Sequence, residues 1–166
     1  MYFFIKEILK NRLSAFFATV LWIWAPYQFV KIFVTASLGE SVSFAFIPLV
    51  LLAIYRFSLF GLALSLAGLI LTHMISLIVF LPLIVSFAFW VLKKTEKVKK
   101  LFLGSLLAFG LSAFYLIPAI RERPYTFYQE IIAYQYHQQF TALRKLIYSP
   151  WGYGAPKFGP GELSLQ

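Results

Sequence analysis

The 166-residue sequence contains neither cysteine nor aspartate. The lack of cysteine excludes disulfides, thiolate metal sites and a cysteine nucleophile within this chain. Because aspartate is also missing, every carboxylate side chain in the chain is a glutamate. Any acid–base chemistry that uses one of its carboxylates must draw on Glu7, Glu40, Glu96, Glu122, Glu130 or Glu162.

Charge of either sign is scarce. Only 13% of the residues are charged and 61% are hydrophobic, whereas about a quarter of the residues of a soluble domain are charged. No Asp, Glu, Lys or Arg occurs from Phe57 to Leu92. About 20 apolar residues cross a bilayer, so this stretch is long enough for two short crossings. It is too apolar for a helix of a soluble protein. The composition predicts a polytopic membrane protein.

Five apolar segments can be drawn. Each is expected to be helical, because a lone strand in lipid would leave its backbone groups unpaired, and the alternation typical of barrel strands is absent. The predicted fold is therefore an all-α transmembrane bundle of about five spans, the first two of them short for a core of about 30 Å. The segments are Leu13–Trp24, Val42–Tyr55, Phe57–Leu71, Ile75–Leu92 and Leu101–Ile117.

The basic residues indicate an orientation. In a soluble protein the net charge of +9 would favour nucleic-acid binding, but here the basic residues flank apolar spans, so we expect no nucleic-acid partner. Counting alternate sides places three basic groups on one face, which the positive-inside rule makes cytoplasmic together with the N-terminus of the chain. We therefore expect a multi-pass protein of the inner membrane. The groups are Lys6, Lys10 and Arg12; Arg56; and Lys93, Lys94, Lys97, Lys99 and Lys100.

The residues after the last span are expected to lie outside the cytoplasm. Residues 125–148 place apolar and aromatic side chains at helical intervals, which is typical of an amphipathic surface helix. The Gly/Pro-rich run after Ser149 predicts a loop. We expect a transmembrane region over residues 1–120 and an extracytoplasmic region over residues 121–166. Both ends of the chain look like cuts through a larger protein.

Glu40 and His73 are the two candidate cavity residues. Glu40 stands immediately before an apolar span, where ionisable groups often face a cavity or a ligand path. Its alternative role is that of an acidic residue complementing a helix N-terminus. His73, between the third and fourth spans, could bind a phosphate or act as a base, or it could be a polar connector in a tight turn. The other histidine, His137, shows no ligand spacing with His73, so no metal site is expected.

Arg121 and Arg123 follow the fifth span. They could pair with an anionic headgroup or a pyrophosphate, or they could serve as ordinary interfacial anchors. No catalytic triad and no pair of catalytic carboxylates can be argued from the sequence.

Four segments occurring in order resemble a known family. They are APYQFVKIFVTASLGESVSFAFIPLVL, ALSLAGLILTHMISLIVFLPLI, LSAFYLIPAI and SPWGYG…GPGELSLQ. Together they are similar to a family of large prokaryotic membrane proteins labelled "6-pyruvoyl-tetrahydropterin synthase-related", which is itself similar to GT-C type glycosyltransferases. The family positions map to Pro26–Tyr27, Gly39–Glu40, His73 and Pro150–Gly154. Thr35 and Met74 stand where family members often have Arg and Asn.

This resemblance implies transfer of a sugar from a polyprenyl-phosphate donor on the non-cytoplasmic face, with the main catalytic acid in an outer loop outside this chain. Under this reading Lys31, Arg121 and Arg123 would hold donor phosphates. Trp151 and Tyr153 would stack on a sugar ring or, alternatively, anchor their loop. The sequence does not identify a cofactor, and membrane lipid is the expected partner, with a polyprenyl-phosphate-linked sugar as the partner that the resemblance implies. The alternative is a non-catalytic membrane protein, such as a transporter or flippase subunit or an assembly factor.

Overall fold

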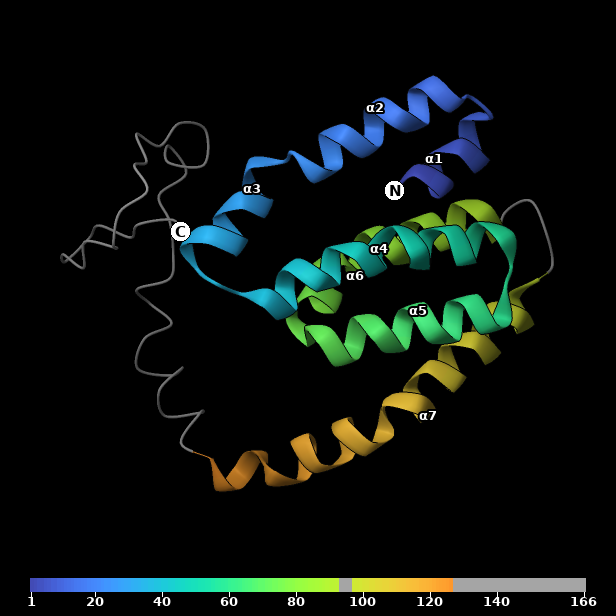
Figure 1. Cartoon of the computed structure of the whole chain (residues 1–166). Coiled ribbons are helices and arrows are strands. Elements are labelled where there is room, and N and C mark those ends of the chain that lie inside the picture. Colours follow the sequence, from blue (N-terminus) through green and yellow to red (C-terminus); the bar gives the residue numbers. More distant parts are fainter. Residues whose placement is uncertain (93–96, 127–166) are drawn as a thin grey trace. The chain divides into compact units, whose positions relative to one another are not determined.

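The computed structural model describes residues 1–92 and 97–126, and these fold into helices with no strand among them. The predicted all-α fold is therefore confirmed for this part of the chain (Figure 1). The elements are α1 (Tyr2–Leu9), α2 (Arg12–Ile23), α3 (Pro26–Phe29), the π-helix η1 (Val30–Val34), α4 (Leu38–Arg56), α5 (Leu59–Thr72), α6 (Met74–Leu92), α7 (Val98–Glu122) and the 3₁₀ helix η2 (Arg123–Tyr125).

The helices α4, α5 and α6 run side by side and enclose the core (Figure 1). The centre of this core consists of Ile47 and Val50 from α4 and Leu69 and Ile70 from α5, which are almost fully buried. Ile47 and Val50 are three residues apart, so both project from one side of α4. On α6 the buried residues are Ser76, Ile84 and Val91, at intervals close to seven that form a single stripe. Partly buried residues such as Leu77, Phe80 and Phe87 flank this stripe and pack against the core, and most other residues of α6 are exposed.

Short polar turns join the helices. Asn11 begins α2, because its side-chain oxygen accepts hydrogen bonds from the backbone N–H groups of Leu13 and Ser14. Between α4 and α5, Phe57 adopts a left-handed conformation (φ 51°) and Ser58 caps α5 by accepting from the N–H of Gly61. The turn between α5 and α6 is the single residue His73. These turns bring distant segments of the sequence together.

The span count of about five is not confirmed. Within the described residues, α4, α6 and the stretch Val98–Tyr125 are long and apolar enough to cross a membrane. A fourth span results if α2 and the segment Pro26–Phe33, bent by 40° relative to each other, are counted as one. The helix α5 has only 14 residues and extends about 21 Å at 1.5 Å per residue, which is shorter than a typical hydrocarbon core.

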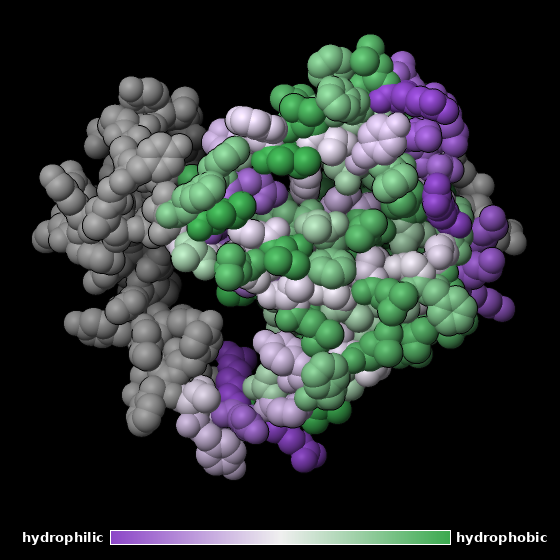
Figure 2. All heavy atoms as spheres, in the orientation of Figure 1, coloured by the Kyte–Doolittle hydropathy of each residue, from purple (hydrophilic) through white to green (hydrophobic). Residues whose placement is uncertain are grey.

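Large apolar side chains are exposed on all of the long helices. Leu21, Phe60, Phe102 and Phe114 are each at least 66% exposed. Hydrophobic residues cover much of the visible flank in Figure 2, while hydrophilic ones gather at the end where α4 turns into α5. Contiguous apolar surface of this extent is unusual for a soluble monomer. It is compatible with a membrane protein.

The basic residues near the turns gather at one end of this bundle. Glu7, which follows Lys6 in α1, bonds to Lys10 and also to Arg56 at the end of α4. The ammonium group of Lys97 lies 5.0 Å from the ring centroid of Phe57. One member of each of the three predicted basic groups, Lys10, Arg56 and Lys97, therefore lies at this end. Which side of a membrane they occupy stays a prediction.

The chain divides into two compact units, Met1–Leu116 and Ile117–Gln166. In the first unit α7 approaches the start of α5 closely at Gly104, where a methyl group would lie 3.1 Å from the carbonyl oxygen of Leu59. Gly104, Ala108 and Ser112 recur every four residues on the buried side of α7, a spacing that allows helices to approach closely. Nearly all of the predicted amphipathic helix and the whole Gly/Pro-rich loop lie outside the described residues.

Candidate functional site

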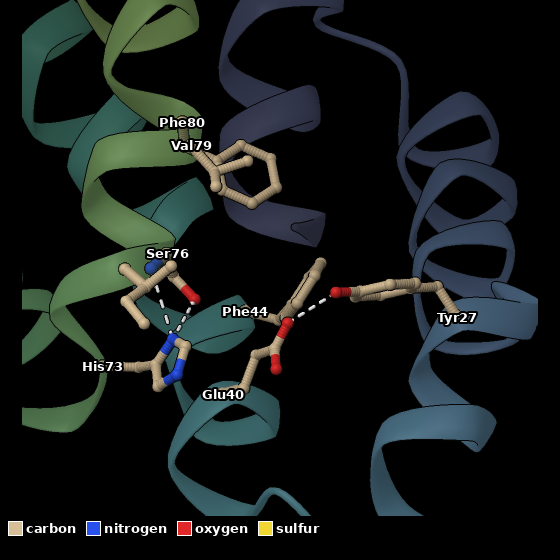
Figure 3. Close-up of a pocket in the computed structure, with 8 residues that line it drawn as sticks. Tyr27, Glu40, Phe44, His73, Ser76, Val79 and Phe80 are labelled. Carbon is tan, nitrogen blue, oxygen red and sulfur yellow. Dashed lines mark hydrogen bonds between the residues drawn. The ribbon is translucent and has the colours of Figure 1, made fainter. Parts of the chain in front are cut away.

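A cavity of about 420 Å³ lies where the start of α4 meets the turn between α5 and α6. Glu40 and His73, 33 residues apart in the sequence, both line it (Figure 3). The structure therefore brings together the two residues that the sequence singles out. The remaining lining residues are Tyr27, Phe44, Ile75, Ser76, Val79 and Phe80.

Glu40 lies in the first turn of α4. This position agrees with its alternative role, because a carboxylate there complements the exposed N–H groups and the dipole of the helix. The same side chain also lines the cavity, so the two roles predicted for Glu40 coexist. Its position is set by the helix start at Leu38, which follows the cap residue Ser37.

Two side chains from the preceding segment bind the Glu40 carboxylate. The hydroxyl of Tyr27 donates a hydrogen bond to Oε1 at 2.5 Å, and the ammonium of Lys31 lies 3.1 Å from Oε2. Lys31 also lies 5.0 Å from the centroid of the Tyr27 ring, within the range of a cation–π contact. The Lys31 and Glu40 side chains are only 16% and 14% exposed. Through Glu40, Tyr27 links α3 and Lys31 links η1 to the start of α4.

His73 caps α6. Its Nδ1 accepts a hydrogen bond from the backbone N–H of Ser76 at 3.2 Å and lies 2.8 Å from the Ser76 hydroxyl oxygen. A nitrogen that accepts from a backbone N–H carries no proton, so in this arrangement the proton of the neutral ring is on Nε2. Within the described residues Nε2 forms no hydrogen bond, and it lies on the side of the ring that faces Glu40 (Figure 3). His73 can thus offer a hydrogen-bond donor to a ligand in the cavity.

Two buried serines extend this network from α6 to α4. The hydroxyl oxygens of Ser43 and Ser76 lie 2.9 Å apart, and the Ser43 hydroxyl also lies 2.6 Å from the Glu40 carbonyl oxygen. Both serines are nearly inaccessible to solvent. A buried hydroxyl without a partner costs free energy; here each serine contacts the other and also a polar atom of its own turn, the Glu40 carbonyl oxygen for Ser43 and Nδ1 of His73 for Ser76. This pair fixes the register of α4 against α6 directly beneath the cavity.

The far wall of the cavity is aromatic and apolar. The ring of Phe44 packs edge-on against that of Phe80 and obliquely against that of Tyr27, with centroids 5.7 and 5.6 Å apart. A cavity with one polar rim and one apolar wall suits a ligand that has both a polar and an apolar part.

The other predicted substrate-binding residues are placed differently. Lys31 does not line the cavity, because it is bound to Glu40 on the side of Tyr27. Arg121 and Arg123 are exposed residues of the second compact unit, so phosphate binding by them stays a prediction. Trp151 and Tyr153 lie outside the described residues. Across the described ranges, no three His or Glu side chains gather in a way that could hold a metal ion.

Sequence reasoning missed the serines and the wall of the cavity. Ser43 follows Glu40 by three residues and Ser76 follows His73 by three, a spacing that puts each serine on the same helix face as its partner. A polar residue followed three positions later by a serine occurs at both places, within otherwise apolar helices. This repeated pattern could have indicated the two serines. Nothing in the sequence indicates that Phe44 and Phe80 meet.

Comparison of the chain with family models, with curated proteins and with solved structures finds no match. The class that the geometry defines is a helical membrane-protein region with a polar-rimmed cavity. The resemblance to the GT-C-like family stays a prediction.

Proposed function

We propose that the chain is part of an integral membrane protein that resembles GT-C glycosyltransferases and handles a polyprenyl-phosphate-linked sugar on the non-cytoplasmic face of the inner membrane. The observation that carries this proposal is that Glu40 and His73 line one cavity. In α4, Glu40 is 16 residues from Arg56, which corresponds to about 24 Å along the helix. The cavity therefore lies at the end of α4 opposite the basic residues.

The chemistry of the cavity suits a sugar hydroxyl group. The Glu40 carboxylate has lone pairs beyond those used by Tyr27 and Lys31, and can accept from a hydroxyl. Nε2 of His73 can donate to another hydroxyl, and the Phe44–Phe80 wall can take the apolar face of a sugar ring. In this proposal Glu40 and His73 orient the substrate, and the main catalytic acid lies elsewhere. Lys31, Arg121 and Arg123 would hold donor phosphates, and Lys31 would have to leave Glu40 to do so.

One observation favours the alternative, a non-catalytic membrane protein. Glu40 is already neutralised by Lys31 within the chain, and Nδ1 of His73 is engaged in capping α6. Residues held in this way can serve to fix the turns of a bundle. In a non-catalytic protein the cavity would result from this packing alone, or would bind a ligand without catalysing a reaction.

The test is sugar transfer from a polyprenyl-phosphate hexose by the full-length protein in proteoliposomes. We expect Glu40→Gln and His73→Ala each to lower the rate by at least about tenfold, because loss of an orienting contact costs reaction geometry. The matched control is Glu7→Gln, which removes the same charge from another ion pair at the basic end and should change the rate by less than about twofold.

Two results would go against the proposal. If Glu40→Gln and His73→Ala transferred sugar at the unaltered rate, the cavity would not be the site. If the intact protein bound the lipid-linked sugar but never transferred it, the non-catalytic alternative would replace the enzyme.

A further inference from the structure

A second cavity, of about 280 Å³, lies on the flank of the bundle between α4 and α5. Its α4 wall includes Phe46, Leu49 and Arg56, and its α5 wall includes Ser58, Gly61 and Leu64. Along each helix these residues recur at intervals of three, four or seven, so each set forms one face. The cavity is thus a groove that follows both helices.

The length of the groove corresponds to one leaflet. Phe46 and Arg56 are ten residues apart on α4, which is about 15 Å along the helix and half of a hydrocarbon core of about 30 Å. Phe46 closes the inner end, because its ring lies against Gly68 of α5, where a side chain would overlap it. Leu49 and Leu64 on the rims are 44% and 65% exposed, so the groove opens toward the surrounding lipid.

The end of the groove at Arg56, away from the middle of the bundle, is cationic. The Arg56 side chain is 52% exposed, and one of its nitrogens bonds to Glu7 at 2.8 Å. A guanidinium has five N–H donors, so donors remain for a second anion. Lys10 bonds to the same Glu7, and Lys97 packs on Phe57, the residue after Arg56. Two cations therefore share the Glu7 carboxylate, and Lys97 adds a third positive charge beside Phe57.

We propose that this groove binds an anionic phospholipid, with one acyl chain between α4 and α5 and the headgroup phosphate on Arg56. The apolar length, the opening toward lipid and the excess of positive charge at headgroup depth together select this ligand over a zwitterionic lipid or a further helix. The site is separate from the Glu40–His73 cavity and does not depend on the proposed function.

The proposal can be tested by native mass spectrometry of the purified chain with phosphatidylglycerol and phosphatidylcholine of identical acyl chains. We expect at least about fivefold preferential retention of phosphatidylglycerol, since one basic residue near an anionic headgroup contributes about that factor. Arg56→Gln should remove most of this preference. The control Arg12→Gln, at an exposed cation of the same end that does not line the groove, should preserve it to within about twofold.

A second pair of variants tests the apolar part of the groove. Leu64→Trp should lower the retention of both lipids, because the larger ring fills the groove. Leu71→Trp changes a residue of the same helix two turns further along, beyond the groove, and should leave retention unchanged. Glycerol 3-phosphate added in excess should fail to displace the bound lipid, because it lacks the acyl chain.

Equal retention of the two lipids by the unaltered chain would overturn the proposal. So would equal effects of Arg56→Gln and Arg12→Gln, which would indicate general charge attraction, or displacement of the lipid by glycerol 3-phosphate. Unchanged retention in Leu64→Trp would show that no acyl chain occupies the groove.

Discussion

Glu40 and Glu7 each form an ion pair, and the two pairs differ in their exposure to solvent. Glu40 and Lys31 are largely shielded from solvent, whereas Glu7 and Arg56 are 30% and 52% exposed. Exposed ion pairs contribute little to stability, while removal of one partner from a shielded pair leaves a charge without compensation. The pair at Glu40 is therefore the more sensitive of the two to substitution.

The pair at Glu7 predicts a dependence of stability on pH. The hydrogen bonds from Arg56, and then from Lys10, lower the pKa of Glu7 below its ordinary value, which is about 4.3. A carboxyl whose pKa is lower in the folded state stabilises the fold above its unfolded-state pKa, and this contribution is lost as pH falls through its folded-state pKa.

We therefore expect Glu7→Gln to lower the Tm slightly at pH 7 and to change it less at pH 3. Thermal unfolding in detergent at the two pH values would measure this. Glu122→Gln, a change of the same type at an exposed carboxyl of the second unit, serves as the control and should change the Tm at pH 7 by less than Glu7→Gln does, because exposed charges contribute little to stability. A Tm difference for Glu7→Gln that grows on acidification would contradict the assignment.

At the scale of single residues, the sequence draws attention to Glu40 and His73 but not to the residues that they contact. Glu40 and His73 stand out because they interrupt apolar segments. Their binding to Tyr27, Lys31 and Ser76 depends on distances set by folding. Lys31 illustrates the difficulty, since a lone cation in a loop suggests an anionic ligand, and its anion is a residue of the same chain.

At the scale of elements, glycines at two positions allow neighbouring segments to approach α4 and α5 closely. Gly68 allows the ring of Phe46 to lie directly on α5, and Gly39 approaches the carbonyl oxygen of Thr72, where a methyl carbon would lie only 2.7 Å away. Both glycines are in helices, where glycine is costly relative to alanine. The close approach of the helices accounts for their use here.

Gly68→Ala should therefore destabilise the bundle by about 1–3 kcal/mol through overpacking against Phe46. Gly110 is the matched control, because it also lies in a helix and has no neighbouring atom within 4 Å of an added methyl. Gly110→Ala should be neutral or stabilising by up to about 1 kcal/mol. Unfolding by denaturant in detergent would compare them, and equal effects of the two substitutions would show that the Phe46 contact is unimportant.

The positions of the long helices were predictable because lack of charge and backbone hydrogen bonding leave little choice in lipid. The segment predicted as Val42–Tyr55 is α4, Leu38–Arg56, extended at its start by a turn that contains Glu40. The segment predicted as Phe57–Leu71 is α5, which is too short to be counted as a span. The π-helix at Val30–Val34 and the bend before it leave no clear mark in an apolar sequence, since periodicity weakens where every face is hydrophobic.

At the scale of the molecule, the first unit has two chemically different ends. One carries Lys10 and Arg56 on Glu7 and Lys97 on the neighbouring Phe57, and the other carries the Glu40–His73 cavity. Successive turns of antiparallel helices lie at opposite ends of a bundle. Because basic and non-basic turns alternate along the sequence, the sequence was sufficient to predict that one end would be basic. The sequence could not predict that the cavity would form, because that depends on how closely α4 and α6 pack.

The most direct test of the account is the accessibility of these two ends in intact cells. The chain has no cysteine, so a single introduced thiol can be labelled without background. We predict that Ala36→Cys, beside the cavity end of α4, reacts with a membrane-impermeant maleimide in intact cells, and that Lys99→Cys, at the basic end, reacts only after permeabilisation. Labelling of both positions from the same side, or in the reverse order, would contradict the membrane arrangement on which the proposed function depends.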